Sequence, residues 1–330
     1  MRVLAMLHLF PPQHNAGAER MVLAMLRALV DRGHDVDVLL SQKHPEITGP
    51  YELHGINVHP CRDKTDPFRF ISATDVIVTH LENTQRAAAL GESYRIPVAK
   101  IVHNTFTPTR MQLQKGISLA VYNSEWMAEE FSDLDVHSIV VRPPVRVADY
   151  ETTPGDAITL INLYEPKGPK TFYALAERFP DLPFLAVHGA YGKQVVRDLP
   201  NVEHVAHIDG DRMRDEVYAR TKILLVPSDY ESWGRVGIEA MASGIPVIAH
   251  PTPGLKESLG EAGIFCDRRK IDDWEAAVNK LLKPRSYAAA SKKAKARAAA
   301  LDPADDLDRW CAAMDELAAR RAKVRHLTPA

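Results

Sequence analysis

The sequence predicts an α/β protein made of two doubly wound domains. Short, unbroken apolar runs alternate with helical patterns along most of the chain, which is typical of parallel sheets covered by helices on both faces. The chain has 330 residues, which is long for one hydrophobic core and comfortable for two domains. A segment rich in proline and turn residues, RPPVRVADYETTPGD at 142–156, separates two halves that follow the same plan.

The first half opens with an apolar strand at 2–10 and an amphipathic helix at 18–33, which ends at Gly33, a usual helix stop. The further strands expected in this half, with helices between several of them, lie at 35–41, 56–61, 75–80, 97–104, 119–124 and 138–143. We assign residues 1–148 to this N-terminal domain.

The second half, 149–302, repeats the alternation without repeating the sequence. Its expected strands lie at 157–163, 184–189, 201–208, 222–228, 246–250 and 263–267, and its expected helices at about 169–179, 212–221, 234–243, 271–282 and 286–300. A last helical segment, 303–330, follows Asp302. The basic, alanine-rich stretch before it is short of the bulky apolar residues that interfacial helices need. We therefore interpret it as a solvated helix face, with a contact to a membrane or to nucleic acid as the open alternative.

Composition excludes several classes of function. The net charge of −2 gives no bulk attraction to nucleic acid or to an anionic membrane. No apolar run approaches the roughly 20 residues of a membrane span. The three cysteines, Cys61, Cys266 and Cys311, are far apart and favour a reducing, cytoplasmic setting over a disulfide framework. The fourteen histidines are scattered, so no metal site is expected.

One stretch carries the functional hypothesis. DYESWGRVGIEA, at 229–240, holds Glu231 and Glu239 with seven residues between them, around an expected helix start at Trp233 and Gly234. Free amides and the dipole at a helix N-terminus favour a phosphate, and a glycine there allows close approach.

The spacing of the two glutamates favours an elongated ligand. Eight residues at helical rise span about 12 Å, more than the roughly 5 to 9.5 Å between the carboxylates of glycosidases. A nucleotide sugar has hydroxyl-rich ends and an anionic centre, and carboxylates accept hydrogen bonds from hydroxyls. The structural alternative is that the acids only stabilise a helix start.

Three other features point to the same kind of ligand. Gly17, in AGAER, follows the first strand and opens the first helix. Lys167 and Lys170 flank Gly168 at the matching place of the second domain, where a diphosphate could be neutralised. His103 ends an apolar strand. The alternatives for these residues are an ordinary turn, solvated surface lysines and a structural histidine.

Together these residues resemble the family-four retaining glycosyltransferases. The resemblance covers nearly the whole chain and is strongest over 222–254, which includes the E-x7-E spacing; GAER and NSEWMAEEF (123–131) also resemble family segments. It implies the GT-B fold, in which two Rossmann-like domains face each other across a cleft. It further implies that the N-terminal domain binds the acceptor and that the last helix crosses back to that domain.

The resemblance also implies an activity and a site. A hexose-type sugar would pass from a nucleoside diphosphate sugar, such as a UDP-sugar or a GDP-sugar, to an acceptor with retention of configuration, without a bound metal or other cofactor. The catalytic residues would be His103, Lys167 and Glu231. The residues that bind the donor would be Gly17, Asn162, Lys170, Ser232, Trp233, Gly234, Arg235, Val236 and Glu239.

Two positions depart from the family pattern. Asn162 stands where an arginine is common, and Ala16 where the family often has a further glycine. A diphosphate would then face one evident cation, Lys167, so Lys170 or Arg235 is expected to compensate. Arginine opposes the dipole in a first helical turn, which predicts that Arg235 has a ligand, or a carboxylate such as Asp229, as its partner.

Two other kinds of function fit the same residues. One is a nucleotide-sugar epimerase or sugar phosphate synthase of the same fold, and the other is a non-catalytic nucleotide-sugar binding protein. The acceptor stays open among a lipid, a metabolite, a glycan and a protein, and the oligomeric state stays open as well.

Overall fold

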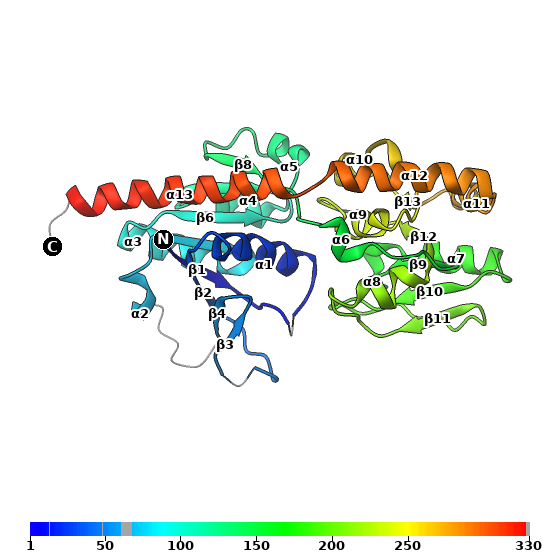
Figure 1. The fold of residues 1–330 in the computed structure, drawn as a ribbon, viewed down its shortest axis with the longest axis horizontal. Coiled ribbons are helices and arrows are strands. Elements are labelled where there is room, and N and C mark those ends of the chain that lie inside the picture. The colour runs from blue at the N-terminus through cyan, green and yellow to red at the C-terminus, as the bar shows by residue number, and fades with distance from the viewer. Residues whose placement is uncertain (13, 48, 61–67, 328–330) are drawn as a thin grey trace. The chain divides into compact units, whose positions relative to one another are not determined.

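The chain folds into two units, each an α/β layer structure. The computed structural model describes residues 1–12, 14–47, 49–60 and 68–327. Contacts divide it into Met1–Pro144 together with the chain from Pro303 onward (unit 1), and Val145–Asp302 (unit 2) (Figure 1). The division after Pro144 lies four residues before the boundary that the sequence suggested. The predicted fold class, two parallel-sheet α/β domains, is confirmed.

In its described residues, unit 1 holds an eight-stranded sheet in the order β3-β4-β2-β1-β5-β6-β7-β8. Its pairs are parallel except for β3 with β4. The strands are β1 (Arg2–Leu7), β2 (Asp35–Leu40), β3 (Tyr51–Leu53), β4 (Ile56–His59), β5 (Val76–His80), β6 (Val98–Val102), β7 (Leu119–Tyr122) and β8 (Ser138–Val140). The short antiparallel β3 was not among the predicted strands.

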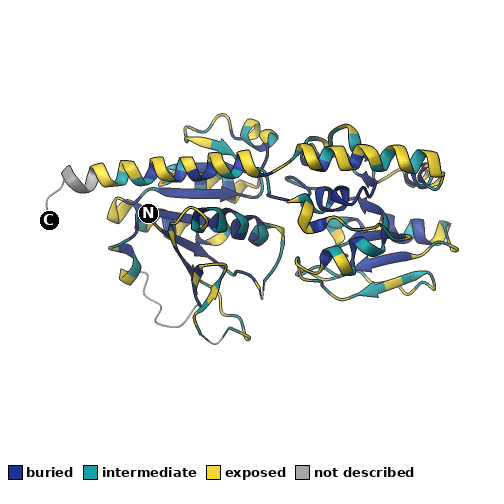
Figure 2. Cartoon of the chain, viewed as in Figure 1, coloured by how far each residue is buried: buried dark blue, intermediate teal, exposed yellow. Residues whose placement is uncertain are grey.

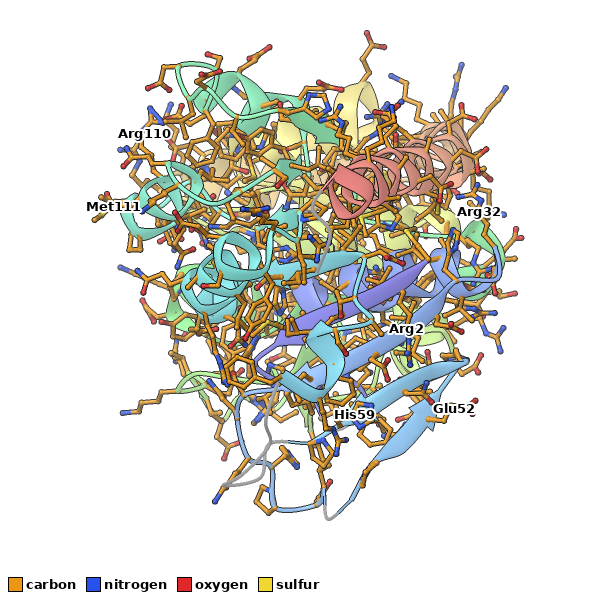
Figure 3. The ribbon with its side chains drawn as sticks, turned by 90° about the vertical axis from the view of Figure 1, so that its left-hand side faces the viewer. Arg2, Arg32, Glu52, His59, Arg110 and Met111 are labelled. Carbon is orange, nitrogen blue, oxygen red and sulfur yellow. The ribbon has the colours of Figure 1, made fainter. Side chains whose placement is uncertain are left out.

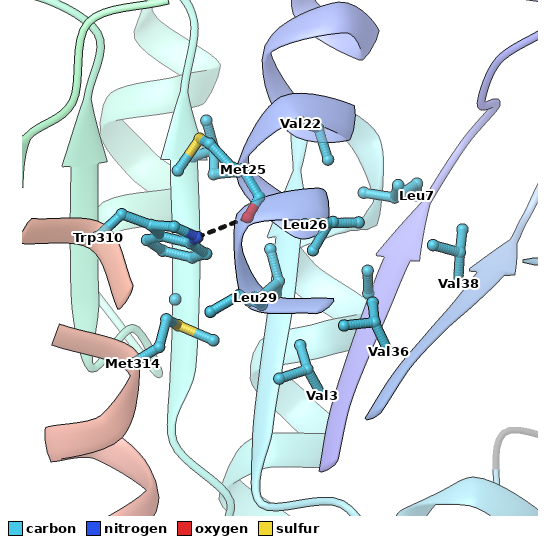
Figure 4. Packing of buried hydrophobic residues seen from close by; sticks show 14 of the residues in the cluster. Val3, Leu7, Val22, Met25, Leu26, Leu29, Val36, Val38, Trp310 and Met314 are labelled. Atoms are coloured by element: carbon cyan, nitrogen blue, oxygen red, sulfur yellow. Dashed lines mark hydrogen bonds between the residues drawn. The ribbon is translucent and has the colours of Figure 1, made fainter. Parts of the chain in front are cut away.

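The helices of unit 1 cover the faces of this sheet. They are α1 (Gly17–Val30), α2 (Phe68–Ile71), α3 (Thr84–Tyr94), α4 (Thr107–Leu113), α5 (Glu125–Glu130) and α13 (Ala304–Leu327), with a 3-10 turn, η1, at Leu81–Asn83. The last helix, α13, packs on α1: Trp310 is fully buried and its Nε1 donates to the Met25 carbonyl at 3.0 Å (Figure 4). Met314 joins the same apolar cluster, so the C-terminal helix is part of the core of unit 1.

Unit 2 contains a parallel sheet in the order β11-β10-β9-β12-β13-β14. The strands are β9 (Ala157–Ile161), β10 (Phe184–Val187), β11 (Val202–Val205), β12 (Thr221–Val226), β13 (Val247–Ala249) and β14 (Ile264–Phe265). The chain order reverses between β9 and β12, and open α/β sheets bind ligands at the carboxyl ends of strands around such a point.

The helices of unit 2 follow the prediction with three corrections, the first being a short helix at Val147–Tyr150 where no helix was predicted. They are α6 (Val147–Tyr150), α7 (Pro169–Arg178), α8 (Met213–Glu216), α9 (Arg235–Ala242), α10 (Pro253–Leu259), α11 (Ile271–Leu281) and α12 (Pro284–Ala300), with 3-10 turns η2 (Glu165–Lys167), η3 (Tyr218–Arg220) and η4 (Gly260–Ala262). The helix expected at 212–221 is instead a single turn, α8, followed by η3. Helix α10 was not predicted, although Thr252 caps it by accepting from the Leu255 amide at 3.2 Å and Pro253 begins it.

Burial follows the layers of each unit. The central strands are buried, while the outer faces of the helices are exposed (Figure 2). Among the described residues, no helix combines the length and the hydropathy that a membrane span requires.

Lys100 is an exception to the apolar composition of the central strands. It lies on β6 with a relative exposure of 1%. Its Nζ donates to the Thr109 carbonyl at 3.3 Å and to Gln112 Oε1 at 2.6 Å, both on α4. On the same helix, Arg110 and Met111 project outward (Figure 3). Burial lowers the pKa of Lys100 to about 7, so its charge changes near neutral pH.

This lysine predicts a pH dependence of stability. Between pH 7 and its ordinary pKa of 10.5, the unfolded chain binds the Lys100 proton more tightly than the folded chain does. The free energy of unfolding should therefore rise from pH 7 to pH 9, by about 2 kcal/mol from this group. Urea unfolding of the natural protein and of Lys100→Met at both pH values measures the effect. The variant should lack that part of the rise, and equal pH dependence in the two proteins would contradict the assignment.

Candidate functional site

The candidate site of unit 2 lies at the carboxyl ends of β9 and β12, which are neighbours in the sheet. The loops that follow these strands contact each other, since the Asp229 amide donates to the Pro166 carbonyl at 3.0 Å. Gly168 has φ +81, and a Cβ there would lie 2.6 Å from the Pro227 carbonyl oxygen. The glycine therefore allows the loop after β9 to pack closely against the end of β12.

An ion pair joins the two loops. Lys167 Nζ donates to Glu231 Oε1 at 2.5 Å, and Ser228 Oγ donates to the same oxygen at 2.9 Å. Burial opposes the charge of Lys167, but the Glu231 carboxylate outweighs that effect and raises the lysine pKa. The side chains keep 24% and 14% exposure, respectively. The pair is thus charged, oriented and partly open to a ligand.

The second motif glutamate is held by a different set of groups. Glu239 accepts from Tyr218 OH at 2.6 Å and from Arg235 Nε, and Arg235 also donates to Tyr150 OH at 2.9 Å. The carboxylate partner of Arg235 is therefore Glu239, one turn along the same helix. Asp229, which the sequence suggested, pairs with Arg268 at 3.2 Å instead. Burial opposes the charge of Arg235, yet Tyr150 and Glu239 hold its pKa above the ordinary value.

The start of α9 offers backbone donors. Gly234 precedes the helix with φ +82, a conformation that glycine adopts without strain. No side chain in the described part of the chain caps this end. Trp233 is buried at 3% exposure and anchors the turn. The first amides of α9, at Arg235 and Val236, therefore form an N-terminus of the kind that binds anions.

A second glycine fixes the loop that carries Glu231. A Cβ at Gly254, on α10, would lie 2.3 Å from the Glu231 carbonyl oxygen and 2.4 Å from that of Ser232. Only a glycine permits this approach of α10 to the loop. Gly254 was not predicted as a site residue, because its effect depends on the packing of a helix that was not predicted.

The remaining predicted residues of unit 2 lie between β9 and the first turn of α7. Asn162 has φ +75, and its Oδ1 accepts from the Tyr164 amide at 3.0 Å, so it shapes the turn. Lys170 is exposed in the first turn of α7. Lys167 belongs instead to the 3-10 turn η2, and Gly168 separates the two elements. The two lysines therefore belong to different elements, with Lys170 at the start of α7.

In unit 1, Gly17 and His103 follow β1 and β6. Gly17 is exposed at the first position of α1, and a Cβ there would meet no atom within 4 Å. His103 Nε2 lies 3.1 Å from Nδ1 of the fully buried His80. Burial, followed by the charges of nearby His8 and Lys100, lowers the pKa of His103 to about 3, so the ring is neutral at physiological pH. The roles of Gly17 and His103 toward a donor stay predictions.

Comparisons with known proteins identify the class. Residues 192–298 match the family model for glycosyl transferases group 1. Over 87 residues the chain is 40% identical to the D-inositol 3-phosphate glycosyltransferase of Rhodococcus opacus (strain B4). This match covers 26% of this chain and 19% of that protein. The match thus spans less than a fifth of the length of this curated relative.

Two solved structures share the fold. Sucrose-phosphate synthase from Thermosynechococcus elongatus superposes with a TM-score of 0.78 at 16% identity, over 97% of this chain and all of that one. The Anabaena protein HepE in complex with UDP-glucose gives a TM-score of 0.75 at 16% identity, over 96% of this chain and all of that one.

The two parallel-sheet units, together with these neighbours, define a protein of the GT-B fold. The segment 192–298 matches the family glycosyl transferases group 1. The resemblance to the family-four glycosyltransferases is thereby confirmed, and the matched segment contains both motif glutamates.

The packing of Gly254 gives a test of the site geometry. Gly254→Ala should displace the Glu231 loop and lower any activity that depends on it, by up to about a hundredfold, the effect of a misplacement of about 1 Å. Thr252→Ala is the matched control, because it weakens the same helix start by about 1 kcal/mol without adding an atom against the loop.

Thermal unfolding and ligand binding of both variants distinguish the two effects. Thr252→Ala should lose stability and keep its ligand affinity, whereas Gly254→Ala should lose affinity. If Gly254→Ala binds nucleotides as tightly as the natural protein, the loop is not held by this contact.

Proposed function

We propose that the chain transfers a hexose-type sugar from a nucleoside diphosphate sugar to an acceptor, with retention of configuration. The observation that carries the proposal is the partly exposed Lys167–Glu231 pair next to the uncapped N-terminus of α9. This combination offers a cation, helix amides and a carboxylate at one place. A diphosphate linked to a sugar needs these three kinds of partner.

The anionic centre of the donor has two sources of positive potential. The amides of Arg235 and Val236 point out of the start of α9, and the helix dipole adds to them. Lys167 stays protonated because Glu231 stabilises its charge. These groups balance the diphosphate without a divalent cation, so we propose that sugar transfer is metal-independent with respect to the donor.

The two glutamates suit the two ends of the donor. A carboxylate has about four acceptor positions, and Glu231 uses those of one oxygen for Lys167 and Ser228. We assign its remaining positions to hydroxyls of the donor sugar. Glu239 is held by Tyr218 and Arg235, and we assign its free positions to the ribose. The UDP-glucose bound to HepE supports a UDP-sugar as the first donor to test.

The proposed reaction exchanges one bond at the anomeric carbon for another. The bond to the diphosphate oxygen breaks as the acceptor oxygen forms its bond on the same face, and the acceptor proton passes to the leaving phosphate. The task of the protein is to stabilise the departing charge and to hold the acceptor in place. Lys167 and the α9 amides perform the first task in this scheme.

A product assay tests the function. A thermal-shift screen of nucleotide sugars selects the donor, and incubation with acceptors of the four open classes follows, without added divalent cations. Release of nucleoside diphosphate coupled to a glycosylated product supports the proposal. Binding without turnover would favour a nucleotide-sugar binding protein, and conversion of the donor sugar without an acceptor would favour an epimerase. A sugar phosphate product would favour the synthase that the sucrose-phosphate synthase neighbour suggests.

The same assay tests the metal independence of the reaction. A strict need for magnesium or manganese would show that Lys167 and the α9 amides do not balance the diphosphate charge.

The two glutamates should respond differently to substitution. Glu239→Gln should weaken the binding of UDP and of UDP-glucose equally, because both ligands contain the ribose assigned to Glu239. The loss should be about 1.5–3 kcal/mol, the contribution of a hydrogen bond to a charged group. Glutamine is preferable to alanine, since its side-chain oxygen can still accept the hydrogen bond of Arg235, which alanine cannot. Glu231→Gln should reduce transfer far more than it reduces UDP binding. Calorimetric titration of both variants measures their affinity for UDP, and the product assay measures transfer. Unchanged UDP affinity in Glu239→Gln would reject the ribose role.

The lysines assigned to the diphosphate should lose different amounts of turnover when they are replaced by alanine. Lys167→Ala should greatly reduce turnover. We expect Lys170→Ala to reduce turnover almost as much as Lys167→Ala. Arg235 already pairs with Glu239 and Tyr150, so Lys170 is the cation that can compensate for Asn162. Lys280→Ala, an exposed lysine on α11, is the control. Steady-state kinetics decide, with folding checked by circular dichroism. Turnover in Lys170→Ala equal to that of the Lys280→Ala control would show that Lys170 does not compensate.

A further inference from the structure

A buried cluster of potential metal ligands lies in unit 1. His8 directly follows β1, Glu19 lies in the first turn of α1, and His80 is the last residue of β5. Strands β1 and β5 are parallel neighbours, with Met6 opposite Thr79, so their carboxyl ends meet at one edge. The three residues are 7%, 2% and 0% exposed, respectively. The topology of the sheet therefore brings together groups that are far apart in the sequence.

The donor atoms of the cluster are close to one another. One ligand atom from each of His8, Glu19 and His80 lies within 4.8 Å of the others, and His8 Nε2 is 3.3 Å from Glu19 Oε1. These atoms belong to three different elements, so a common partner would tie the loop between β1 and α1 to the end of β5. A single ion between them would bring each to a usual coordination distance of about 2.0–2.2 Å after small shifts.

Several buried polar atoms of this cluster lack a hydrogen-bond partner within the described part of the chain. They are His8 Nδ1, Glu19 Oε2 and His80 Nε2. Buried polar groups are nearly always satisfied, and exceptions call for an unseen water or ion. His8 presents its Nε2 to Glu19 and its Nδ1 to Glu82, whose Oε2 lies 3.7 Å away. The unsatisfied Glu19 Oε2 and His80 Nε2 therefore indicate a bound species that His8 Nε2 can share.

The surroundings of His80 resemble those of a metal ligand. Its Nδ1 is 3.1 Å from His103 Nε2, while its Nε2 is left without a partner. Histidine ligands commonly use one ring nitrogen for the metal and the other for a hydrogen bond that fixes the ring. His103 supplies such a hydrogen bond here.

We propose that His8, Glu19 and His80 bind one zinc ion. Two imidazoles and one carboxylate are a ligand set that zinc accepts in proteins, with a fourth position for water or another ligand. His14 is the candidate for that fourth position, since its Nε2 lies 3.9 Å from Glu19 Oε2. The ion would neutralise Glu19 and hold the β1–α1 loop and, through His80, the ring of His103. The proposed zinc ligands belong to unit 1, whereas the groups assigned to the diphosphate belong to unit 2.

Zinc binding to the full-length chain tests the proposal without any nucleotide. The protein is stripped with a chelator, dialysed and titrated with zinc by calorimetry, and cobalt is added in parallel to record the visible absorption of the bound ion. We expect one zinc per chain and cobalt bands of tetrahedral intensity. Glu19→Gln and His80→Ala should weaken zinc binding by more than about tenfold, a loss that changes in outer-shell partners alone already cause. His137→Ala, an exposed histidine of unit 1, is the control and should bind zinc like the natural protein.

The outcomes separate this inference from the proposed function. Absence of stoichiometric zinc in the natural protein, or unchanged zinc affinity in Glu19→Gln and His80→Ala, would overturn the site and leave water as the shared partner. If those variants fail to fold, the cobalt spectrum of the natural protein decides by itself: weak octahedral bands contradict the site. UDP binding, measured on the same preparations, reports on the donor site separately.

Discussion

The ion pair between Lys167 and Glu231 connects the loops after β9 and β12, and the rest of the candidate donor site depends on it. Gly168 allows these loops to approach, the Asp229 amide joins them, and Gly254 seats the Glu231 loop against α10. The pair is neither fully buried nor fully solvated. A fully buried pair would be closed to a ligand, whereas an exposed pair would contribute little and hold no fixed geometry.

Each motif glutamate pairs with its own cation: Glu231 with Lys167 and Glu239 with Arg235. The first pair joins two loops, whereas the second lies within one helix. Glu231 shares Lys167 across two loops, which places a charged lysine beside the start of α9. Glu239 holds Arg235 within one helix, and Tyr150 and Tyr218 complete that network. Removing one partner of such a buried pair typically costs about 3–5 kcal/mol. The Arg235 pair therefore also stabilises the first turn of α9, whose amides stay available to an anion.

Sequence patterns predicted the sheets well because parallel strands buried on both faces are nearly continuous apolar runs. They predicted less about side-chain partners. Lys167 and Glu231 are 64 positions apart, and only the sheet order brings them together. The Arg235–Glu239 pair could have been predicted, since residues four apart on a helix are neighbours. The cluster of His8, Glu19 and His80 could not be predicted, because its members lie in separate parts of the sequence that only the sheet brings together. The η3 turn stands where the sequence predicted a continuous helix, and it places Tyr218 in a buried hydrogen bond with Glu239. Local helix propensity does not reveal such a tertiary contact.

The most direct test of the account is a crystal structure of the chain with UDP bound. The account predicts that the diphosphate lies at the start of α9, within hydrogen-bond distance of the Arg235 or Val236 amide and of Lys167 Nζ, and that the ribose hydroxyls meet Glu239. A nucleotide bound elsewhere, or a diphosphate out of reach of both Lys167 and the α9 amides, would contradict the account.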